Sequence, residues 1–416
     1  MDLQVHPILE KNTIPNPALW YVFSSTGESP TMRVGHTCTF VPGQDGNSRK
    51  VFCIGGANPS GPFNEVYILD LETFQWDTCE SPALIARYEH SAFVPQSQPG
   101  KIYIFGGATQ TGNLNDIQVF DVGSKTWSTL TPKGTPPSPR THHVNVCVGD
   151  SFIVYSGGQS GADPVTDRQV HCYDALTNTW STLNIKGDPP KPRHGHIMAA
   201  VGNKVYLHGG MANQTFYDDL HVLDLDKKTW MLVKNKKVYP SARAAHGGVA
   251  VGSDICVFGG MNKEGALEDM YKLDTVSMKW TKIELDGPPP TNRLDFGMCA
   301  IQLDPPPAEV PSGGGDGVAS GGQQVKAVLE QQLQGLNLTG KTDGATSSPK
   351  LAAGQQDQDT ESSSTTVDGS SVVASGEPGQ DQVAAVAGKT LDMLFLFGGM
   401  DTEGEIFDDS LVYLVS

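Results

Sequence analysis

The sequence predicts an all-β protein: a six-bladed β-propeller whose blades are four-stranded antiparallel sheets. Three observations lead to this prediction. A double glycine follows an apolar stretch six times, a tryptophan closes each of the first five repeats, and the sixth tryptophan lies near the N-terminus instead of in the last repeat. Repeats of about 50 residues that each hold several short strands are typical of propellers.

The double glycine sets the period of the repeat. The six pairs are Gly55-Gly56, Gly106-Gly107, Gly157-Gly158, Gly209-Gly210, Gly259-Gly260 and Gly398-Gly399. The first five pairs are 51, 51, 52 and 50 residues apart, and the last follows after 139. Glycine tolerates a positive φ and the close approach of another backbone, so the pairs predict a sharp turn at one place in every blade.

The first repeat shows the four expected strands in order. A strand that opens at Arg33 and reaches residue 41 is followed by apolar segments at 50–54 and 66–70, and then by a short segment around Trp76. Polar residues, glycines and prolines separate these segments, as expected for turns. The content is that of one propeller blade.

The other repeats keep the same landmarks. An arginine opens each repeat: Arg33, Arg87, Arg140, Arg193, Arg243 and Arg293. A histidine follows three residues later in five repeats: His36, His90, His143, His196 and His246. An acidic residue opens the third strand: Glu65, Asp116, Asp167, Asp219, Asp269 and Asp409. A tryptophan closes five repeats: Trp76, Trp127, Trp180, Trp230 and Trp280.

The recurring polar residues predict a structural role. A residue that returns in nearly every blade serves the scaffold rather than one site. We therefore expect the arginines and acidic residues to form charge-assisted hydrogen bonds that tie strands and turns together, and the histidines to hold blades together.

Trp20 predicts how the ring closes. The last repeat ends after its third strand, at 409–414, without a tryptophan of its own, whereas Trp20 lies in an apolar segment with no strand before it. We expect this N-terminal strand to complete the sixth blade, which removes an exposed sheet edge. Deletion of residues 18–24 should then destabilise the whole domain.

Composition limits the classes of partner. The net charge of −17 argues against nucleic acid or an anionic membrane as the main partner, because both require a basic face. No apolar run is long enough for a transmembrane helix, and residues 1–16 lack a signal-peptide pattern. The seven cysteines are odd in number and scattered, which predicts reduced thiols in a cytosolic protein.

The sequence divides into four segments. Residues 1–17 read as a loose N-terminal tail, 18–303 as the closing strand with blades one to five and the start of blade six, and 390–416 as the end of blade six. Residues 304–389 are acidic, rich in Gly, Ser and Pro, and without aromatics, so we expect a disordered insertion within blade six. Within it, the segment 325–338 is either a transient helix or a partner-binding helix.

No motif for catalysis or for nucleotide binding emerges, and we predict no catalytic, cofactor-binding or metal-binding residues. His142-His143 and His194-Gly195-His196 are the metal candidates, but His143 and His196 are repeat positions, and His142 and His194 lack a third ligand at a suggestive spacing. An enzyme would need polar residues that are unique to one or two blades and converge on the central channel.

The loops after each double glycine differ between repeats, and the loops before the opening arginine are often proline-rich. A rigid scaffold that presents variable loops is a common arrangement for binding partners. The alternative is that these loops vary because nothing constrains them. The first interpretation predicts a protein-interaction scaffold rather than an enzyme.

The repeat resembles the kelch motif, with its double glycine after the second strand and its late tryptophan, over roughly residues 18–303 and 390–416. A narrower similarity, to propeller-only Rab effectors of the kelch family, rests on four stretches: Arg33-Val34-Gly35-His36, the run from Val51 to Pro59, Arg87-Tyr88-Glu89-His90 and the run from Phe397 to Ile406. That resemblance implies binding to the GTP form of a late-endosomal Rab GTPase in transport from endosomes to the trans-Golgi network. It also implies contact with endosomal membranes only through partners, other trafficking proteins among them.

Two alternatives stay open. Some kelch-like propellers are copper oxidases or sugar mutarotases, so the family also implies an enzyme with a metal or sugar site in the central channel as a possible function. A cytoskeletal or transcriptional scaffold is the other. The resemblance does not indicate which face of the propeller binds, or the oligomeric state.

Overall fold

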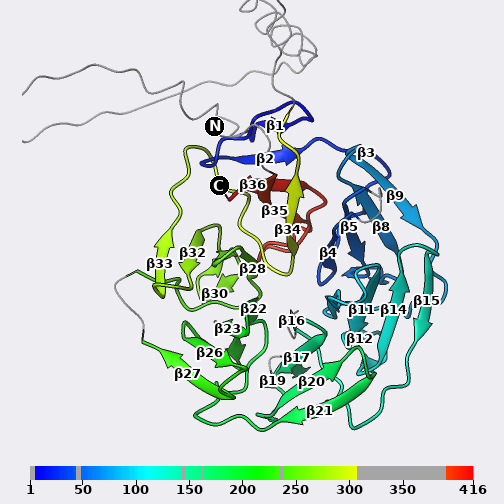
Figure 1. Ribbon diagram of the computed structural model, residues 1–416. Coiled ribbons are helices and arrows are strands. Elements are labelled where there is room, and N and C mark those ends of the chain that lie inside the picture. Colours follow the sequence, from blue (N-terminus) through cyan, green and yellow to red (C-terminus); the bar gives the residue numbers. More distant parts are fainter. Residues whose placement is uncertain are drawn as a thin grey trace, which may run out of the picture. The chain divides into compact units, whose positions relative to one another are not determined.

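The computed structural model describes residues 5–43, 48–142, 146–161, 163–234, 238–306 and 390–415. In these residues all regular secondary structure is β-strand, and none is helix. Six sheets, each built on four antiparallel strands, lie around a central channel, with the first strand nearest the channel and the fourth toward the rim (Figure 1); two of the sheets add a short parallel strand beside the fourth. The predicted six-bladed propeller is confirmed.

Each blade contains four main strands. Blades one and two consist of β4 (Thr37–Val41), β5 (Lys50–Ile54), β8 (Val66–Asp70) and β9 (Gln75–Cys79), then β10 (Ser91–Phe93), β11 (Lys101–Phe105), β14 (Ile117–Asp121) and β15 (Thr126–Thr129). Blades three and four consist of β16 (Cys147–Val148), β17 (Ser151–Tyr155), β20 (Val170–Asp174) and β21 (Thr179–Leu183), then β22 (Ile197–Val201), β23 (Lys204–His208), β26 (Leu220–Asp224) and β27 (Thr229–Val233). Blades five and six consist of β28 (Gly247–Val251), β29 (Asp254–Phe258), β32 (Met270–Asp274) and β33 (Lys279–Lys282), then β34 (Gly297–Leu303), β35 (Leu391–Phe397), β36 (Ser410–Leu414) and β2 (Trp20–Phe23).

Short hairpins follow the second strand of the first five blades. They pair β6 (Ala57–Asn58) with β7 (Gly61–Pro62), β12 (Ala108–Thr109) with β13 (Gly112–Asn113), β18 (Gly158–Ser160) with β19 (Asp163–Pro164), β24 (Met211–Ala212) with β25 (Thr215–Phe216), and β30 (Met261–Asn262) with β31 (Gly265–Ala266). In blade six, a bridge between Met400 and Ile406 takes this place.

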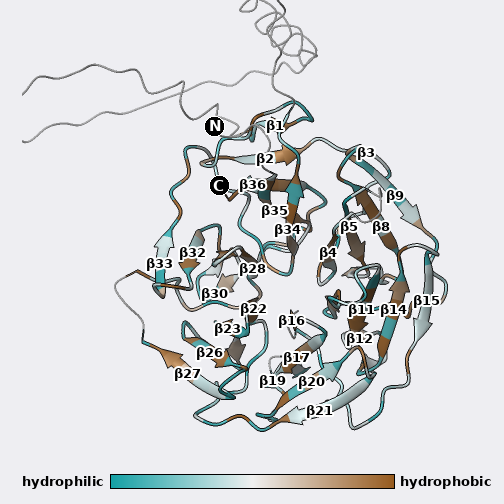
Figure 2. Ribbon diagram, in the orientation of Figure 1, coloured by the Kyte–Doolittle hydropathy of each residue, from teal (hydrophilic) through white to brown (hydrophobic). Residues whose placement is uncertain are grey.

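The hydrophobic core lies between neighbouring blades. The second strand of a blade is covered on both faces, so β5 reads as an almost continuous apolar run and its residues 51–54 are fully buried. Figure 2 shows the middle strands as the most hydrophobic and the rim strands as paler. The repeated tryptophan packs onto the preceding blade: Trp180 on Phe105, and Trp230 on Tyr155. Each tryptophan therefore joins two blades.

The N-terminal strand closes the ring, as the position of Trp20 predicts. β2 pairs antiparallel with β36, and Trp20 lies opposite Tyr413 in this ladder. The parallel β3 (Thr26–Gly27) then continues along β9 of blade one. Gly27 follows Trp20 by seven residues, and a glycine follows Trp127, Trp180 and Trp280 at the same distance. The N-terminal segment therefore matches the usual connection from one blade to the next.

Two details differ from the sequence expectations. A loose tail is expected over 1–17, but β1 (Ile8–Leu9) pairs in parallel with β2 and Leu9 is buried.

In blade three, Ser156-Gly157 rather than Gly157-Gly158 occupies the double-glycine position. Arg140 donates to the carbonyl of Ser156, as the other arginines do to the first glycine of each pair. Ser156 has a φ of 58°, and its hydroxyl donates to the Arg193 carbonyl and accepts from the Arg193 N–H.

The long insertion interrupts blade six between two paired strands. β34 and β35 run together from the Gly297–Phe397 pair to the Leu303–Leu391 pair. Residues 307–389, which are all but the first three of the expected disordered segment 304–389 and include the candidate helix at 325–338, lie outside the described residues. Among the residues described, no helix could cross a membrane.

Candidate functional site

The repeated arginines are buried ties within their own blades. All six side chains are almost fully buried. Arg243 is representative: it donates to both carboxylate oxygens of Asp269 at 2.6 and 3.1 Å and to the carbonyl of Gly259 at 3.1 Å. The ion pairs are Arg33–Glu65, Arg87–Asp116, Arg140–Asp167, Arg193–Asp219, Arg243–Asp269 and Arg293–Asp409. The predicted charge-assisted hydrogen bonds are confirmed.

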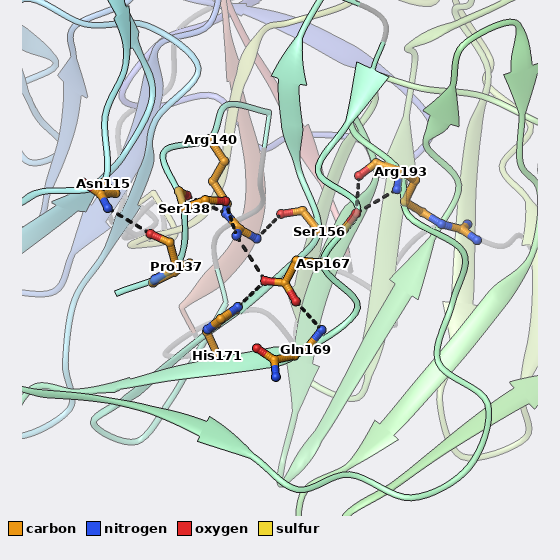
Figure 3. Close-up of polar contacts among 9 residues, drawn as sticks. All are labelled: Asn115, Pro137, Ser138, Arg140, Ser156, Asp167, Gln169, His171 and Arg193. Atoms are coloured by element: carbon orange, nitrogen blue, oxygen red, sulfur yellow. Dashed lines mark hydrogen bonds and ion pairs between the residues drawn. The ribbon is translucent and has the colours of Figure 1, made fainter. Parts of the chain in front are cut away.

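Blade three extends this network (Figure 3). Asp167 accepts from Arg140 at 3.4 Å, from the backbone N–H of Gln169 at 2.7 Å, and shares a 2.5 Å hydrogen bond with His171. The amide of Asn115 donates to the carbonyl of Pro137, which lies in the proline-rich segment before Arg140. These bonds fix the proline-rich loop onto the blade.

The repeated histidines join neighbouring blades. Nε2 of His36 accepts from the N–H of Gly297 in blade six at 3.2 Å. Nε2 of His90 lies 3.2 Å from Oγ1 of Thr37 in blade one. His246 makes a contact of the same length with His208 of blade four. The inter-blade role expected for the histidines holds at these three positions, while His143 lies outside the described residues.

The residue before each of the five repeat histidines, and before Phe296 in blade six, lies at the channel axis. These six residues are Gly35, Glu89, His142, Gly195, Ala245 and Asp295, and all have a positive φ between 43° and 64°. Each N–H donates to the carbonyl of the corresponding residue in the preceding blade, at 2.6 to 3.2 Å, so that the bonds form a closed ring. The bonds hold each blade at its distance from the axis.

Three of these six positions carry ionisable side chains that meet. Nε2 of His142 lies 2.9 Å from Glu89 and Nδ1 lies 3.6 Å from Asp295, with each side chain about one-fifth exposed. Burial lowers the pKa of His142, but the two carboxyl groups outweigh this and raise it to about 9. Burial raises the pKa of Asp295 to about 6, against the attraction of His142. At neutral pH the site is an imidazolium held between two carboxylates.

Sequence reasoning missed this cluster. It considered His142 as a metal ligand and found no partner at a suggestive spacing. The informative signal appears when the six repeats are aligned with one another. At the position before the repeat histidine, three repeats have glycine or alanine, and the other three have Glu89, His142 and Asp295. The structure places them beside His194, whose ring centroid is 5.7 Å from that of His142. The cluster borders a channel cavity of about 380 Å³.

A second candidate surface is the hairpin face, which we define by residues 57–62, 108–113, 158–161, 163–164, 211–216, 261–266 and 400–406. Loops after the second strand and loops before the first strand emerge at the same end of a blade, so the proline-rich segments adjoin this face. A cavity of about 610 Å³ lies between blades two and three, with Asn113, Ser138 and Gln159 among its lining. Asn113 also donates to the carbonyl of Gln159, which links the two hairpins.

The hairpin face is uneven in charge. The hairpin of blade six exposes the carboxylates of Glu403 and Glu405, and that of blade five exposes Glu264 beside Lys263. The hairpins of blades one and four carry uncharged polar residues such as Asn58 and Asn213. The face can therefore distinguish partners by charge as well as by shape.

Comparison with known proteins adds the family. The family model described as the KLHDC2/KLHL20/DRC7 Kelch-repeats domain matches residues 35–260. A rat protein named Rab9 effector protein with kelch motifs is 42% identical over 411 residues, which cover 98% of this chain and 99% of the relative. Cattle and mouse proteins of the same name are 47% identical over 216 residues, or 51% of this chain. In those two proteins the match spans 58% and 57% of the relative's length.

Proposed function

Because the chain belongs to the kelch-repeat family, with relatives named Rab9 effector protein with kelch motifs, we propose that it is an interaction scaffold that binds a GTP-loaded Rab GTPase. The observation that carries the proposal is the hairpin face. Variable, partly acidic loops are mounted on a ring that buried arginine pairs and a closed ring of axial hydrogen bonds make rigid. Loops held this way lose little entropy when they engage a partner.

The GTP form is the expected partner because the switch segments of a GTPase are ordered by the γ-phosphate and released on hydrolysis. A rigid face that fits the ordered switches has little to bind in the GDP form. The carboxylates of the hairpin in blade six fit basic side chains on such a partner.

A pull-down tests the proposal directly. Full-length protein is incubated with Rab9 loaded with a non-hydrolysable GTP analogue or with GDP, and we expect capture only with the analogue. The double variant Glu403→Lys and Glu405→Lys should weaken capture at least tenfold. The matched control, Asp226→Lys, changes an exposed turn between β26 and β27 at the opposite end of a blade and should bind normally. Equal capture of both nucleotide forms would exclude an effector.

The cellular role follows from the partner. We propose action in transport from endosomes to the trans-Golgi network, with membrane contact through the GTPase and other trafficking proteins. Proximity labelling should then report endosomal proteins. A cytoskeletal or nuclear set of neighbours would favour the alternative scaffold roles.

A second candidate function, ligand binding in the channel, draws on the cluster of Glu89, His142 and Asp295. Polar residues unique to a few blades do converge on the axis there, as an enzyme would require. Both ring nitrogens of His142 already face carboxylates. This arrangement favours a structural role, in which the charged cluster stabilises the channel axis, over a role as a general base that takes a proton from a substrate. Binding of a sugar that is lost in His142→Gln would support the channel function instead.

A further inference from the structure

Potential metal ligands from blade one converge at its border with blade six. A ligand nitrogen of His36 and the Sγ atoms of Cys38 and Cys53 all lie within 4.8 Å of one another, and all three residues are buried. We propose that this cluster binds a thiophilic d10 cation, with Zn²⁺ as the reference ion. Thiolate and imidazole are the ligands that such an ion prefers.

The local fold brings these groups together. Cys38 on β4 and Cys53 on β5 are direct partners in the antiparallel ladder, so their side chains lie on the same face of the sheet. His36 immediately precedes β4 and turns its ring toward blade six, where it accepts from the N–H of Gly297. The site is therefore assembled by secondary structure rather than by flexible loops.

Gly297 lies directly against two of the ligands. A Cβ atom at this position would lie 2.5 Å from Sγ of Cys38 and 2.7 Å from Nε2 of His36. Both distances are shorter than any real Cβ contact, so a larger residue at 297 would push these two ligand atoms out of place. A bound ion would replace the Gly297 N–H as the partner of His36.

Cys299 lies near this site on the other side of the border. It belongs to β34 of blade six and to the same buried cluster as Cys38 and Cys53, but its thiol is not among the ligand atoms that lie within 4.8 Å of one another. His36, Cys38 and Cys53 therefore supply three ligands, and the fourth position of a tetrahedral ion would be open to water from the channel. His36, Cys38 and Cys299 line the channel cavity, which gives the ion a path of entry.

The location explains what the ion would do. Blades one and six are the first and last units of the ring, and they are held together without a direct covalent connection between their inner strands. An ion held by His36, Cys38 and Cys53 would stiffen blade one at the place where it meets blade six. A disulfide between Cys38 and Cys53 would use two of the three groups and leave His36 without a role in the cluster; in the structure both cysteines are free.

Cobalt titration tests the site on full-length protein that has been reduced and freed of metal by a chelator. We expect one equivalent of Co²⁺ to bind with a sulfur-to-cobalt charge-transfer band and the visible bands of a tetrahedral ion, and Zn²⁺ to displace it. Cys38→Ser and Cys53→Ser should each weaken binding at least tenfold. Cys256→Ser, at a fully buried cysteine in β29 of blade five, should bind as the wild type does.

Two further measurements separate metal binding from folding. Gly297→Ala keeps every ligand but places a methyl group against Cys38 and His36 and so displaces them, and we expect a folded protein, by circular dichroism, without the cobalt spectrum. Zn²⁺ should raise the melting temperature of the wild type and leave that of Cys38→Ser unchanged. Absence of stoichiometric cobalt binding by the wild type overturns the proposal, as does equal weakening in Cys256→Ser. Mass spectrometry that finds a Cys38–Cys53 disulfide after mild peroxide treatment, in protein that binds no metal, also counts against it.

Discussion

Trp20 is the side chain through which the N-terminal strand holds the ring closed, and Trp20→Ala tests that closure. Its side chain is 1% exposed. Its ring centroid lies 5.3 Å from that of Phe258 in blade five and 5.3 Å from that of Tyr413 in blade six. The substitution therefore removes a contact with both neighbours while the chain outside β2 stays the same.

The expected cost follows from this burial. Replacing a fully buried aromatic side chain by alanine costs about 3–5 kcal/mol, and aromatic pairs add roughly 0.5–1.5 kcal/mol each beyond area burial. We therefore expect a loss of about 4 kcal/mol in the free energy of unfolding. At about 2 °C per kcal/mol, the lower end for large domains, the melting temperature should fall by about 8 °C.

Thermal unfolding followed by circular dichroism at one scan rate measures this shift. Trp280→Ala is the comparison, because Trp280 holds the equivalent place in blade five but is only partly buried, and its fourth strand is joined directly to the third. We expect a smaller shift there. In Trp20→Ala, limited proteolysis should also cut the segment 5–27 before the rest of the domain. A Trp20→Ala protein that melts within about 2 °C of the wild type would refute closure by β2.

Two other predictions concern the buried charges. Arg243→Lys should lower the free energy of unfolding, measured in urea, by about 3 kcal/mol, because an ammonium group cannot make the two-point contact with Asp269 and leaves that carboxylate poorly paired. Lys227→Arg, in an exposed turn, is the control and should leave the stability unchanged. The pKa of His142 is raised to about 9 in the folded protein, so its stabilising contribution is complete below pH 6.5 and is lost as the pH rises through 9. The wild type should lose about 2 kcal/mol between pH 6.5 and 9 that His142→Gln does not lose, and parallel pH profiles would contradict this assignment.

The fold was readable from the sequence because each landmark has a fixed physical role in every blade. The arginine and the acidic residue are paired inside the blade, and the tryptophan packs on the preceding one, so their recurrence alone revealed the unit. Trp20 was assigned to blade six by elimination, and the following Gly27 gives the same register. Blade three shows where pattern reading fails: two adjacent glycines suggested Gly157-Gly158, but Ser156 accepts a positive φ because its hydroxyl is bonded on both sides to Arg193.

The two side-chain clusters at the channel could not be predicted from the repeat pattern. Glu89, His142 and Asp295 are each separated by more than 50 residues in the chain, and only the closed ring of backbone hydrogen bonds brings them to one axis. Cys38 and Cys53 meet because the ladder between β4 and β5 pairs them, and His36 joins them from the turn before β4.

The sequence by itself determined the repeating unit, the number of blades, the strand that closes the ring and the position of the insertion, since all of these are periodic and local. Only the tertiary structure decided which residues face the axis, which thiols meet and which loops share one face. Those features depend on residues that differ from the repeat pattern. The contacts of such residues are known only once the neighbouring blades have been placed around them.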